Sequence, residues 1–534
     1  MNDYKRFGLL ICCSDNGVMN VESVKRLIDV MEKMEYNLLE LSIDDTYKID
    51  DEPYFGYLRG GYTKAEIREI DEYAKEHGIE LVPCIQTLAH LTNLVKLPHY
   101  SDIVDISNIL LIDEPKTYTL IEKMFQSLQQ SFSSRLVNIG FDEAHLVGLG
   151  KYLDKHGYVN RYELLLRHLN KVVEIAEKYG FKVHMWSDMF FRLATGGNYY
   201  DLGVRIPKKV REKVPETVSL CYWDYGEHEL KEEIFDDMFK AHEDFNREIW
   251  YAGGAWCWNG FAPNNNFSLK AMSLAMKQVI KHSVENVFIT LWGNDGNDCS
   301  WFSTLPALYA IRQFSKGVFD MEQIKAGFKE LLGYNFDDFM ILDIPNKTSK
   351  NPECLKIENP CKSLLFNDCF VGWKDHALTQ VDFIPYGEYA KAIENAGKDV
   401  GEYKYLFDSL SALCSVLEKK AYLGINTRKA YKENDKEKLK ELICDYEECA
   451  NRLTVYHEMF RRQWLKEFKP YGFEVHTIRL GGLRARIIEC KRRIEEYLSG
   501  EKTSIPELEE EILPYANWGL QYNSYRGLVT VAQI

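Results

Sequence analysis

Short apolar runs alternate with amphipathic stretches from residue 7 to residue 292 of the chain. The apolar runs are typical of buried strands, and they cover residues 8–13, 37–43, 79–85, 136–142, 181–186, 217–223, 248–254 and 286–292. Between them, apolar residues recur with helical spacing at 21–35, 63–77, 116–131, 160–179, 229–246 and 268–283. Near-continuous apolar strands separated by amphipathic helices indicate a parallel sheet that is buried on both faces.

Eight such units predict an α/β fold in which the sheet closes into a (β/α)₈ TIM barrel. An open doubly wound sheet is the alternative, but it would usually have fewer strands. Neither a GxGxxG motif nor a P-loop follows the first apolar run, which argues against a dinucleotide-binding fold. A barrel carries its catalytic residues at the carboxyl ends of its strands, so we expect the catalytic residues of this chain just after the apolar runs.

The pattern changes after about residue 340. Residues 341–382 contain scattered prolines and predict a linker, whereas 387–432, 434–466 and 474–499 are long, charged and amphipathic, as expected of helices. A chain of 534 residues is also too long for one ordinary core. We therefore predict a catalytic barrel over 1–340, followed by a linker and a helical domain over 341–534.

Composition excludes several classes of partner. The chain has 66 Lys+Arg against 81 Asp+Glu, a net charge of −15 that disfavours nucleic acid. We expect no membrane segment, because no apolar window approaches the roughly eighteen residues of a membrane-spanning helix and no signal peptide is recognisable. Thirteen cysteines without repeated spacing indicate reduced thiols and a cytoplasmic location. The sequence contains neither a CxxC nor an HExxH motif, so we expect no metal site.

One strand end stands out. The run LVNIGFDEAH, residues 136–145, ends in the adjacent carboxylates Asp142 and Glu143. Two neighbouring negative charges repel, so the pair indicates a pocket in which the two acids do different work. Three other Asp-Glu pairs lie in polar surroundings typical of a solvated surface, at 51–52, 71–72 and 113–114.

Polar and aromatic residues follow most of the other predicted strands. They are Asp44, Asp45, His90, Trp186, Asp188, Tyr222, Asp224, Trp256, Trp258, Trp292 and Asn294. Any single tryptophan is more often a core residue than a ligand platform. Several tryptophans near one face, mixed with acids, favour a carbohydrate pocket, because sugars stack their C–H faces on aromatic rings.

Three segments carry a resemblance to a known family. They are PYFGYLRGGYTKAEIREIDEYAKEHGIELVPCIQTLAHL (53–91), FDEAH (141–145) and TLWGNDG (290–296). The chain resembles the β-N-acetylhexosaminidases of glycoside hydrolase family 20, in particular a cytoplasmic bacterial branch that lacks an N-terminal accessory domain. The resemblance implies exo-acting, retaining removal of terminal β-linked GlcNAc or GalNAc from oligosaccharides or glycoconjugate fragments, without metal or cofactor.

The resemblance also implies roles for the strand-end residues. The substrate's own acetamido oxygen attacks the anomeric carbon and forms an oxazolinium intermediate, while Glu143 acts as general acid and base. Asp142 accepts the acetamide N–H, Tyr222 holds the acetamide carbonyl, and Asp224 binds a sugar hydroxyl. His90, with Asp44 or Asp45, orients the catalytic glutamate. The acetamide pocket is walled by Trp186, Trp292 and either Trp256 or Trp258.

The chain departs from the family pattern at the sugar-hydroxyl end. Where the family has LDCSRNAVM, this chain has ICCSDNGVM, so Cys12 replaces an aspartate and Asp15 replaces an arginine. Gly61 replaces a second arginine, Asn294 replaces an acid, and a later glutamate of the family is Asp298 here. We therefore expect altered recognition of the sugar's O3, O4 or O6.

Two other functions stay open from the sequence. One is a family member that binds sugar but hydrolyses it weakly or not at all. The other is a barrel glycosidase that uses two separated carboxylates, such as Glu143 with Asp188 or Asp224. The sequence does not decide between GlcNAc and GalNAc, the linkage or the oligomeric state, with a homodimer as one alternative.

Overall fold

The computed structural model describes residues 4–226, 230–514, 519–520, 524–530 and 532. The chain forms two compact units that interleave along the sequence. We call the first the barrel unit; it comprises Met1–Ala255, Ala271–Trp292 and Tyr309–Asp320. We call the second the helical unit; it comprises Trp256–Lys270, Gly293–Leu308 and Met321–Ile534.

In the part of the chain that the structure describes, eight parallel strands close into a barrel in the order β1-β10-β9-β8-β7-β6-β3-β2. They are β1 (Arg6–Cys12), β2 (Leu38–Ser42), β3 (Glu80–Cys84), β6 (Leu136–Asn138), β7 (Lys182–Trp186), β8 (Ser219–Trp223), β9 (Ile249–Gly254) and β10 (Asn286–Leu291). The predicted (β/α)₈ barrel is therefore confirmed.

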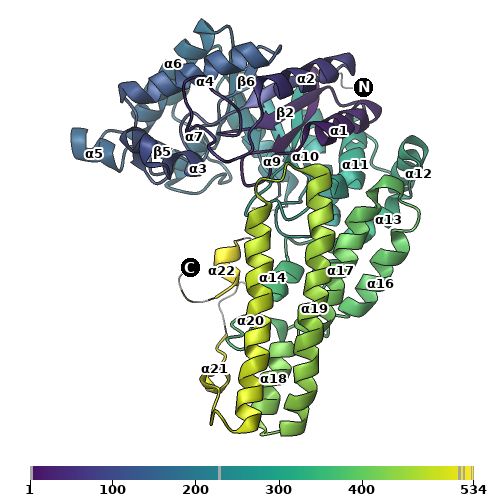
Figure 1. Ribbon diagram of the computed structural model, residues 1–534. Helices are drawn as coiled ribbons and strands as arrows, with labels where there is room; N and C mark the ends of the chain where they lie inside the picture. The colour runs from purple at the N-terminus through teal and green to yellow at the C-terminus, as the bar shows by residue number, and fades with distance from the viewer. Residues whose placement is uncertain (1–3, 227–229, 515–518, 521–523, 531, 533–534) are drawn as a thin grey trace. The chain divides into compact units, whose positions relative to one another are not determined.

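Helices connect successive strands of the barrel (Figure 1). The long ones are α1 (Val21–Lys33), α2 (Lys64–Glu76), α4 (Pro115–Ser131), α6 (Arg161–Lys178), α9 (Glu232–Glu243) and α10 (Asn265–Lys281), and α11 (Leu305–Ser315) follows the last strand. The short ones are α3 (Thr92–Val95), η1 (Pro98–Ile103), α5 (Lys151–His156), α7 (Asp188–Thr195) and α8 (Lys208–Arg211). Local chemistry sets where they begin. Helix α2 starts after Thr63 because Thr63 and Glu66 form a capping box.

A buried polar layer fills the barrel interior. The imidazole Nε2 of His184 lies 2.8 Å from the Glu40 carboxylate, and Asn138 donates to the other oxygen of Glu40 at 3.3 Å. The indole ring of Trp250 stacks on His184 with ring centroids 4.4 Å apart. Because both oxygens of the Glu40 carboxylate have partners, this layer buries the carboxylate without leaving it unpaired.

Two local features differ from the sequence prediction. The strand expected over 136–142 stops at Asn138, because Gly140 and Phe141 have φ values of +76° and +78°, which no strand accommodates. A two-stranded antiparallel sheet of β4 (Val104–Ile106) and β5 (Ile109–Leu110) was not predicted. Strands of two or three residues are too short to show a periodic pattern.

The helical unit confirms the expected C-terminal helical region. Its long helices are α12 (Met321–Leu332), α16 (Tyr386–Ala396), α17 (Lys404–Lys420), α18 (Leu423–Lys432), α19 (Lys436–Glu467) and α20 (Phe473–Ser499). Helix α19 packs between α17 and α20 (Figure 1). Residues 341–382 contain short helices rather than irregular chain. These helices are too short to show a helical period in the sequence. These are η3 (Ile341–Asn346), α14 (Pro360–Phe366) and α15 (Asp375–Leu378).

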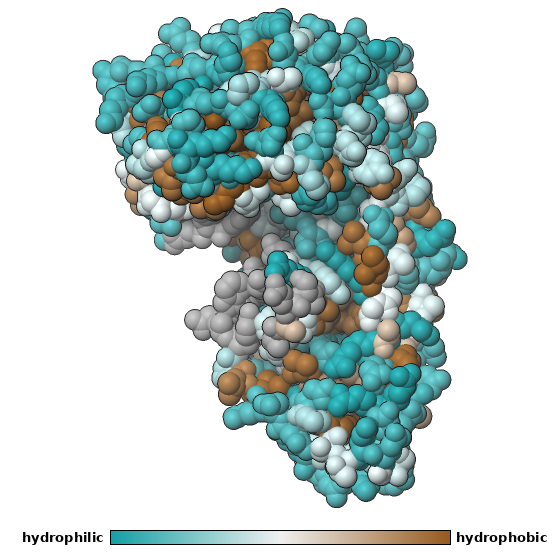
Figure 2. Space-filling model, turned by 60° about the vertical axis from the view of Figure 1, so that its left-hand side comes forward, coloured by the Kyte–Doolittle hydropathy of each residue, from teal (hydrophilic) through white to brown (hydrophobic). Residues whose placement is uncertain are grey.

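The remaining short elements of the helical unit are η2 (Trp301–Thr304), α13 (Phe336–Met340), η4 (Gly401–Tyr403), α21 (Pro506–Glu509) and α22 (Tyr525–Leu528). The face drawn in Figure 2 is mostly hydrophilic, with smaller apolar areas between. Within the described residues, no helix combines the length and the apolar character that crossing a bilayer requires.

Candidate active site

Asp142 and Glu143 lie on a tight turn directly after β6. Phe141 and Glu143 both have left-handed backbone conformations, with φ values of +78° and +53°. Gly140 precedes them at φ +76°, and a Cβ there would lie 2.1 Å from the Gln86 side-chain oxygen. A left-handed conformation is costly for non-glycine residues, and such strain gathers at functional sites. The turn therefore directs two adjacent carboxylates out of the strand end.

The Asp142 side chain has two partners from the segment after β3. Gln86 donates its amide N–H to Oδ1 of Asp142 at 2.9 Å. The Nε2 atom of His90 lies 3.2 Å from Oδ2 of the same carboxylate. Both oxygens of Asp142 are thus held, and the carboxylate orientation is determined by β3 as much as by β6.

Glu143 is held at three points. Its backbone N–H donates to Oδ2 of Asp188 at 3.0 Å. The hydroxyl of Tyr199 donates to Oε1 of Glu143, and His90 Nε2 lies 3.4 Å from Oε2. Its side chain keeps 37% of its surface exposed, against 15% for Asp142. Of the two acids, Glu143 is therefore the more accessible to a substrate.

His90 carries the compensating charge. Desolvation by itself would lower the pKa of His90, but the nearby charges of Asp142, Glu143 and Asp44 raise it to about 10. The imidazole is therefore protonated at neutral pH. Burial opposes ionisation of Asp142, yet the His90 charge and the hydrogen bonds from His90 and Gln86 hold the pKa of Asp142 below its ordinary value.

The two aspartates after β2 have separate environments. Asp44 is buried near Asp45, which raises the pKa of Asp44 to about 7 against the opposing charge of His90. Asp45 instead faces Arg59, with its carboxylate 3.4 Å from the guanidinium. Of the two candidates to act on His90, Asp44 is the one whose charge reaches the imidazole.

The predicted tryptophans fall into two groups. Trp186 and Trp292 lie together in the barrel unit, with ring centroids 6.0 Å apart. Trp256 and Trp258 belong to the helical unit, where their rings stack at 4.2 Å. Asn294 also belongs to the helical unit and is exposed. The structure thus brings one aromatic pair together in each unit.

Tyr222 and Asp224 contact each other at the end of β8. The Tyr222 hydroxyl donates to Oδ2 of Asp224 at 3.1 Å, and the Gly226 N–H donates to Oδ1 at 2.8 Å. The Tyr222 ring is fully buried against Phe239 and His242 of α9. The Tyr222 ring therefore packs between β8 and α9, and its hydroxyl points towards Asp224.

The residues that depart from the family pattern have defined contacts. Cys12 donates its thiol to Asp15 at 3.4 Å. Gly61 packs so closely on the preceding loop that a Cβ would lie 2.6 Å from the Thr46 carbonyl carbon. Asp298, in the helical unit, pairs at 2.7 Å with the fully buried amine of Lys362. Gly61 in particular has no room for a side chain.

Three residues that contact the predicted site residues were not predicted from the sequence. Gln86 contacts Asp142, Tyr199 contacts Glu143, and Arg59 contacts Asp45. Gln86 lies two residues after β3, so its strand-end position was an available signal. Tyr199 lies in the connection between α7 and α8, far from any strand, and no pattern marks it. Arg59 lies two positions before Gly61 and donates to the Ser14 carbonyl.

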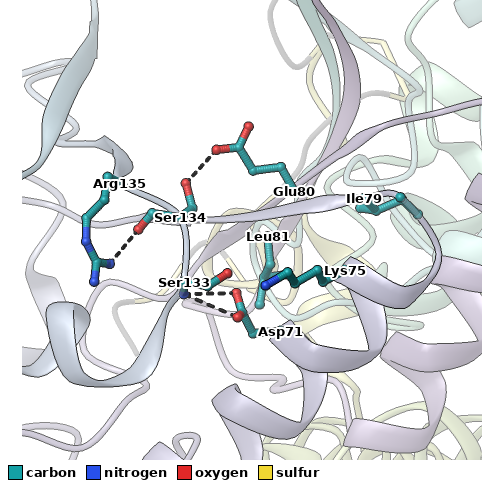
Figure 3. Close-up of a pocket in the computed structure, with 9 residues that line it drawn as sticks. Asp71, Lys75, Ile79, Glu80, Leu81, Ser133, Ser134 and Arg135 are labelled. Atoms are coloured by element: carbon teal, nitrogen blue, oxygen red, sulfur yellow. Dashed lines mark hydrogen bonds between the residues drawn. The ribbon is translucent and has the colours of Figure 1, made fainter.

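A cavity lies at the opposite, amino-terminal end of the strands (Figure 3). Its volume is about 410 Å³, and Asp71, Glu80, Ser133, Ser134 and Arg135 are among the residues that line it. Asp71 accepts the Ser133 N–H, and Glu80 accepts the Ser134 hydroxyl at 2.7 Å. The two carboxylates therefore stabilise the connection into β6, as expected for the end of a barrel that contributes to stability rather than catalysis. Across the described residues, no three His, Cys, Asp or Glu side chains gather to hold a metal.

Sequence models of known families match both parts of the chain. The glycosyl hydrolase family 20 catalytic domain matches residues 15–232, and the glycoside hydrolase 20C C-terminal domain matches residues 337–524. The chain belongs to glycoside hydrolase family 20. The first match includes the Asp142–Glu143 pair and the residues that hold it, which are Gln86, His90, Asp188 and Tyr199.

Individual relatives of this family 20 chain are distant. Hexosaminidase D of Bos taurus is 24% identical over 189 residues, which are 33% of this chain and 51% of that protein. A probable beta-hexosaminidase of Arthroderma benhamiae is 22% identical over 251 residues, 41% of this chain and 38% of that one. The chain therefore spans about half or less of these relatives. Among solved structures, a chitobiase of Flavobacterium johnsoniae is 16% identical with a TM-score of 0.48, covering 86% of this chain and 78% of that one.

Proposed function

We propose that this protein is an exo-acting, retaining β-N-acetylhexosaminidase that removes terminal β-linked GlcNAc or GalNAc from oligosaccharides or glycoconjugate fragments. The observation that carries the proposal is the Asp142–Glu143 pair, held by His90, Gln86 and Asp188 inside a family 20 catalytic domain. Two adjacent acids suit a reaction in which the substrate supplies its own nucleophile, as substrate-assisted glycosidases do.

In this mechanism the acetamido oxygen attacks the anomeric carbon as the glycosidic C–O bond breaks. Glu143 donates a proton to the leaving oxygen and later takes one from the water that opens the oxazolinium intermediate. Asp142 accepts the acetamide N–H and stabilises the positive charge that develops there. The lowered pKa of Asp142 supports this division of labour, because the residue must be ionised to act.

His90 makes the adjacent charges compatible. Its Nε2 atom lies within 3.4 Å of both carboxylates, and its pKa of about 10 keeps it positive over the working pH range. An imidazolium there offsets the repulsion between Asp142 and an ionised Glu143. We assign His90, supported by Asp44, to orienting the pair.

The separated-carboxylate alternative has less support. Asp188 is fully buried and already accepts the Glu143 N–H, so it has no open approach to an anomeric carbon. Asp224 is likewise buried and bonded to Tyr222 and Gly226. Neither aspartate is poised as a free nucleophile.

We further propose that the sugar-hydroxyl end of the site has altered selectivity. Asp15 and Gly61 remove two arginines of the family pattern, and Gly61 has no space for a replacement. Arg59 supplies a guanidinium nearby, but it is engaged by Asp45 and the Ser14 carbonyl. The roles of Tyr222, Trp256, Trp258 and Asn294 at the sugar stay predictions.

The compartment is proposed from the thiols. All thirteen cysteines are free, and twelve of them are buried. A protein with this many reduced thiols suits the cytoplasm, where disulfides are rare.

The deciding experiment is hydrolysis of 4-nitrophenyl β-GlcNAc and β-GalNAc by the wild type, Glu143→Gln and Asp142→Asn. Both variants should lose activity on the order of 10²-fold or more. Glu114→Gln is the matched control, because it alters another Asp-Glu pair, in which Glu114 forms an ion pair with Lys155 at 3.6 Å. Azide should rescue Glu143→Ala on an activated substrate, whose leaving group needs no proton.

Two outcomes would change the proposal. Wild-type rates in both variants would contradict the assigned roles. A silent wild type that still binds a thiazoline analogue by calorimetry would indicate the sugar-binding alternative. A panel of 4- and 6-modified β-N-acetylhexosaminides tests selectivity, and ordinary family efficiency on plain β-GlcNAc would contradict altered recognition.

A further inference from the structure

Asp188 occupies an unusual position beside the catalytic pair. It is the first residue of α7, two positions after Trp186 at the end of β7, and its side chain is fully buried. Its Oδ2 atom accepts the backbone N–H of Glu143 at 3.0 Å. A residue of the next βα unit thus holds the main chain, not the side chain, of the proposed acid/base.

This contact bears on a strained residue. Glu143 has φ +53°, a left-handed conformation that costs an L-residue roughly 1–2 kcal/mol. The conformation persists only if surrounding groups hold it. Because the direction of a side chain follows from the φ of its own residue, the group that holds this N–H also sets where the Glu143 carboxylate points.

The surroundings of Asp188 favour its neutral form. Burial, the Asp142 charge and the Glu143 charge raise the pKa of Asp188 to about 8, while the Glu143 N–H and a hydrogen bond with Trp223 oppose the shift. Tyr199, Tyr200 and Cys221 also interact with Asp188, and their raised pKa values keep them neutral. Of the cations in these surroundings, His90 contacts Asp142 and Glu143, and Arg192 lies over the Tyr199 ring. A neutral carboxyl accepts the N–H through its carbonyl oxygen without adding a third negative charge.

We propose that Asp188 is a positioning residue whose carboxyl oxygen holds the backbone turn of Glu143 and so aims the acid/base at the leaving oxygen. The assignment rests on the proposed hydrolase function but concerns a contact that can be observed without turnover. Asparagine has the same shape and the same carbonyl acceptor, whereas alanine has no acceptor and glutamate is longer by one methylene.

The kinetic test compares Asp188→Asn, Asp188→Ala and Asp188→Glu on a 4-nitrophenyl β-N-acetylhexosaminide. Asp188→Asn should keep kcat within about threefold of wild type. Asp188→Ala and Asp188→Glu should lower kcat about 10- to 100-fold with little change in KM, because binding does not depend on the aim of Glu143. Asp201→Asn, an exposed residue in the connection after α7, is the control and should equal wild type.

A spectroscopic test reads the contact itself. In protein labelled with ¹⁵N-glutamate, the Glu143 amide signal is assigned by its loss in Glu143→Gln. Its proton shift should titrate near pH 8 in the wild type as Asp188 ionises, and should stay flat in Asp188→Asn. This readout separates the inference from the proposed function, since it applies even to a protein that hydrolyses no test substrate.

Each remaining outcome overturns the inference. Wild-type kcat in Asp188→Ala would show that the contact does not position Glu143. Equal loss in Asp188→Asn and Asp188→Ala, in variants that melt as cooperatively as wild type, would show that the ionised form is required. If the Glu143 amide signal of the wild type did not change with pH near 8, this would contradict the assignment of Asp188 as a neutral acid at neutral pH.

Discussion

The contacts around Asp142 explain how two neighbouring carboxylates can have different roles. His90 lies within 3.4 Å of both, while Gln86 contacts only Asp142 and Tyr199 contacts only Glu143. The shared cation permits both charges, and the separate neutral partners distinguish them. Asp142 is consequently fixed and anionic, whereas Glu143 retains the exposure that proton exchange with a substrate requires.

Gln86 provides a prediction at this scale. Gln86→Leu removes the N–H that Asp142 accepts at 2.9 Å, and a hydrogen bond to a charged group contributes about 1.5–3 kcal/mol. We expect kcat/KM to fall about 10- to 100-fold in the 4-nitrophenyl glycoside assay. Gln129→Leu, which loses a bond to the Tyr179 carbonyl on an exposed helix, should leave kcat/KM unchanged. Equal effects of the two substitutions would contradict the assignment.

Among elements, the β4–β5 hairpin has a clear structural task. Asp105 of β4 is buried and accepts the backbone N–H groups of Gly148 and Tyr152 at 2.8 and 2.9 Å. Gly148 lies in the connection that leads from Glu143 to α5, and Tyr152 is the second residue of α5. The hairpin therefore anchors the segment immediately downstream of Asp142 and Glu143, the proposed catalytic pair.

Replacing Asp105 tests this anchoring. Asp105→Ala leaves two buried N–H groups without their acceptor, and each unsatisfied group costs about 1–3 kcal/mol. We expect a lower free energy of unfolding by about 2–5 kcal/mol in urea titrations, together with reduced kcat. Asp102→Ala is the matched control from the adjacent η1, because its ion pair with Lys116 is exposed and should not change the melting temperature. If Asp105→Ala left the free energy of unfolding and kcat unchanged, the segment after Glu143 would not depend on Asp105 for its conformation.

At the scale of the whole molecule, the barrel concentrates groups whose pKa values are raised. Burial first, with nearby negative charge, raises the pKa of Asp188 to about 8 and that of Asp44 to about 7. Nearby carboxylates raise the pKa of His90 to about 10 against its desolvation. In all three the folded state binds more protons than the unfolded chain, so each contribution is complete below the ordinary pKa and disappears as pH rises through the raised one.

The free energy of unfolding should therefore fall as pH rises from about 6 to about 9. The Asp44 and Asp188 contributions disappear near pH 7 and 8, and the His90 contribution declines from its ordinary pKa of 6.5 upward. Denaturant midpoints across this range provide the measurement. Asp188→Asn should flatten the slope between about pH 6 and 8, since asparagine has no proton to lose. An identical slope in that variant would contradict the raised pKa.

The apolar pattern was sufficient to predict the barrel and the helical C-terminal region. Each strand of a barrel is buried on both faces, so it appears in the sequence as a continuous apolar run without reference to its neighbours. The same reasoning predicted Asp142, Glu143 and His90 as site residues, because barrel catalysis takes place just after strand ends. The structure brings these three side chains together. What the apolar pattern could not locate were β4, β5 and α14. The two strands of the hairpin have three and two residues without a long apolar run, and the seven residues of α14 make only about two helical turns.

The sequence by itself determined the fold class and the family, and it predicted Asp142 and Glu143 as the catalytic pair. Only the tertiary structure decided which groups act on that pair. Gln86, Asp188 and Tyr199 approach it from three separate segments of the chain, and Asp44 rather than Asp45 is the aspartate whose charge reaches His90. The physical reason is that hydrogen bonds and pKa shifts depend on distance in space, which closing the barrel sets and no local pattern records.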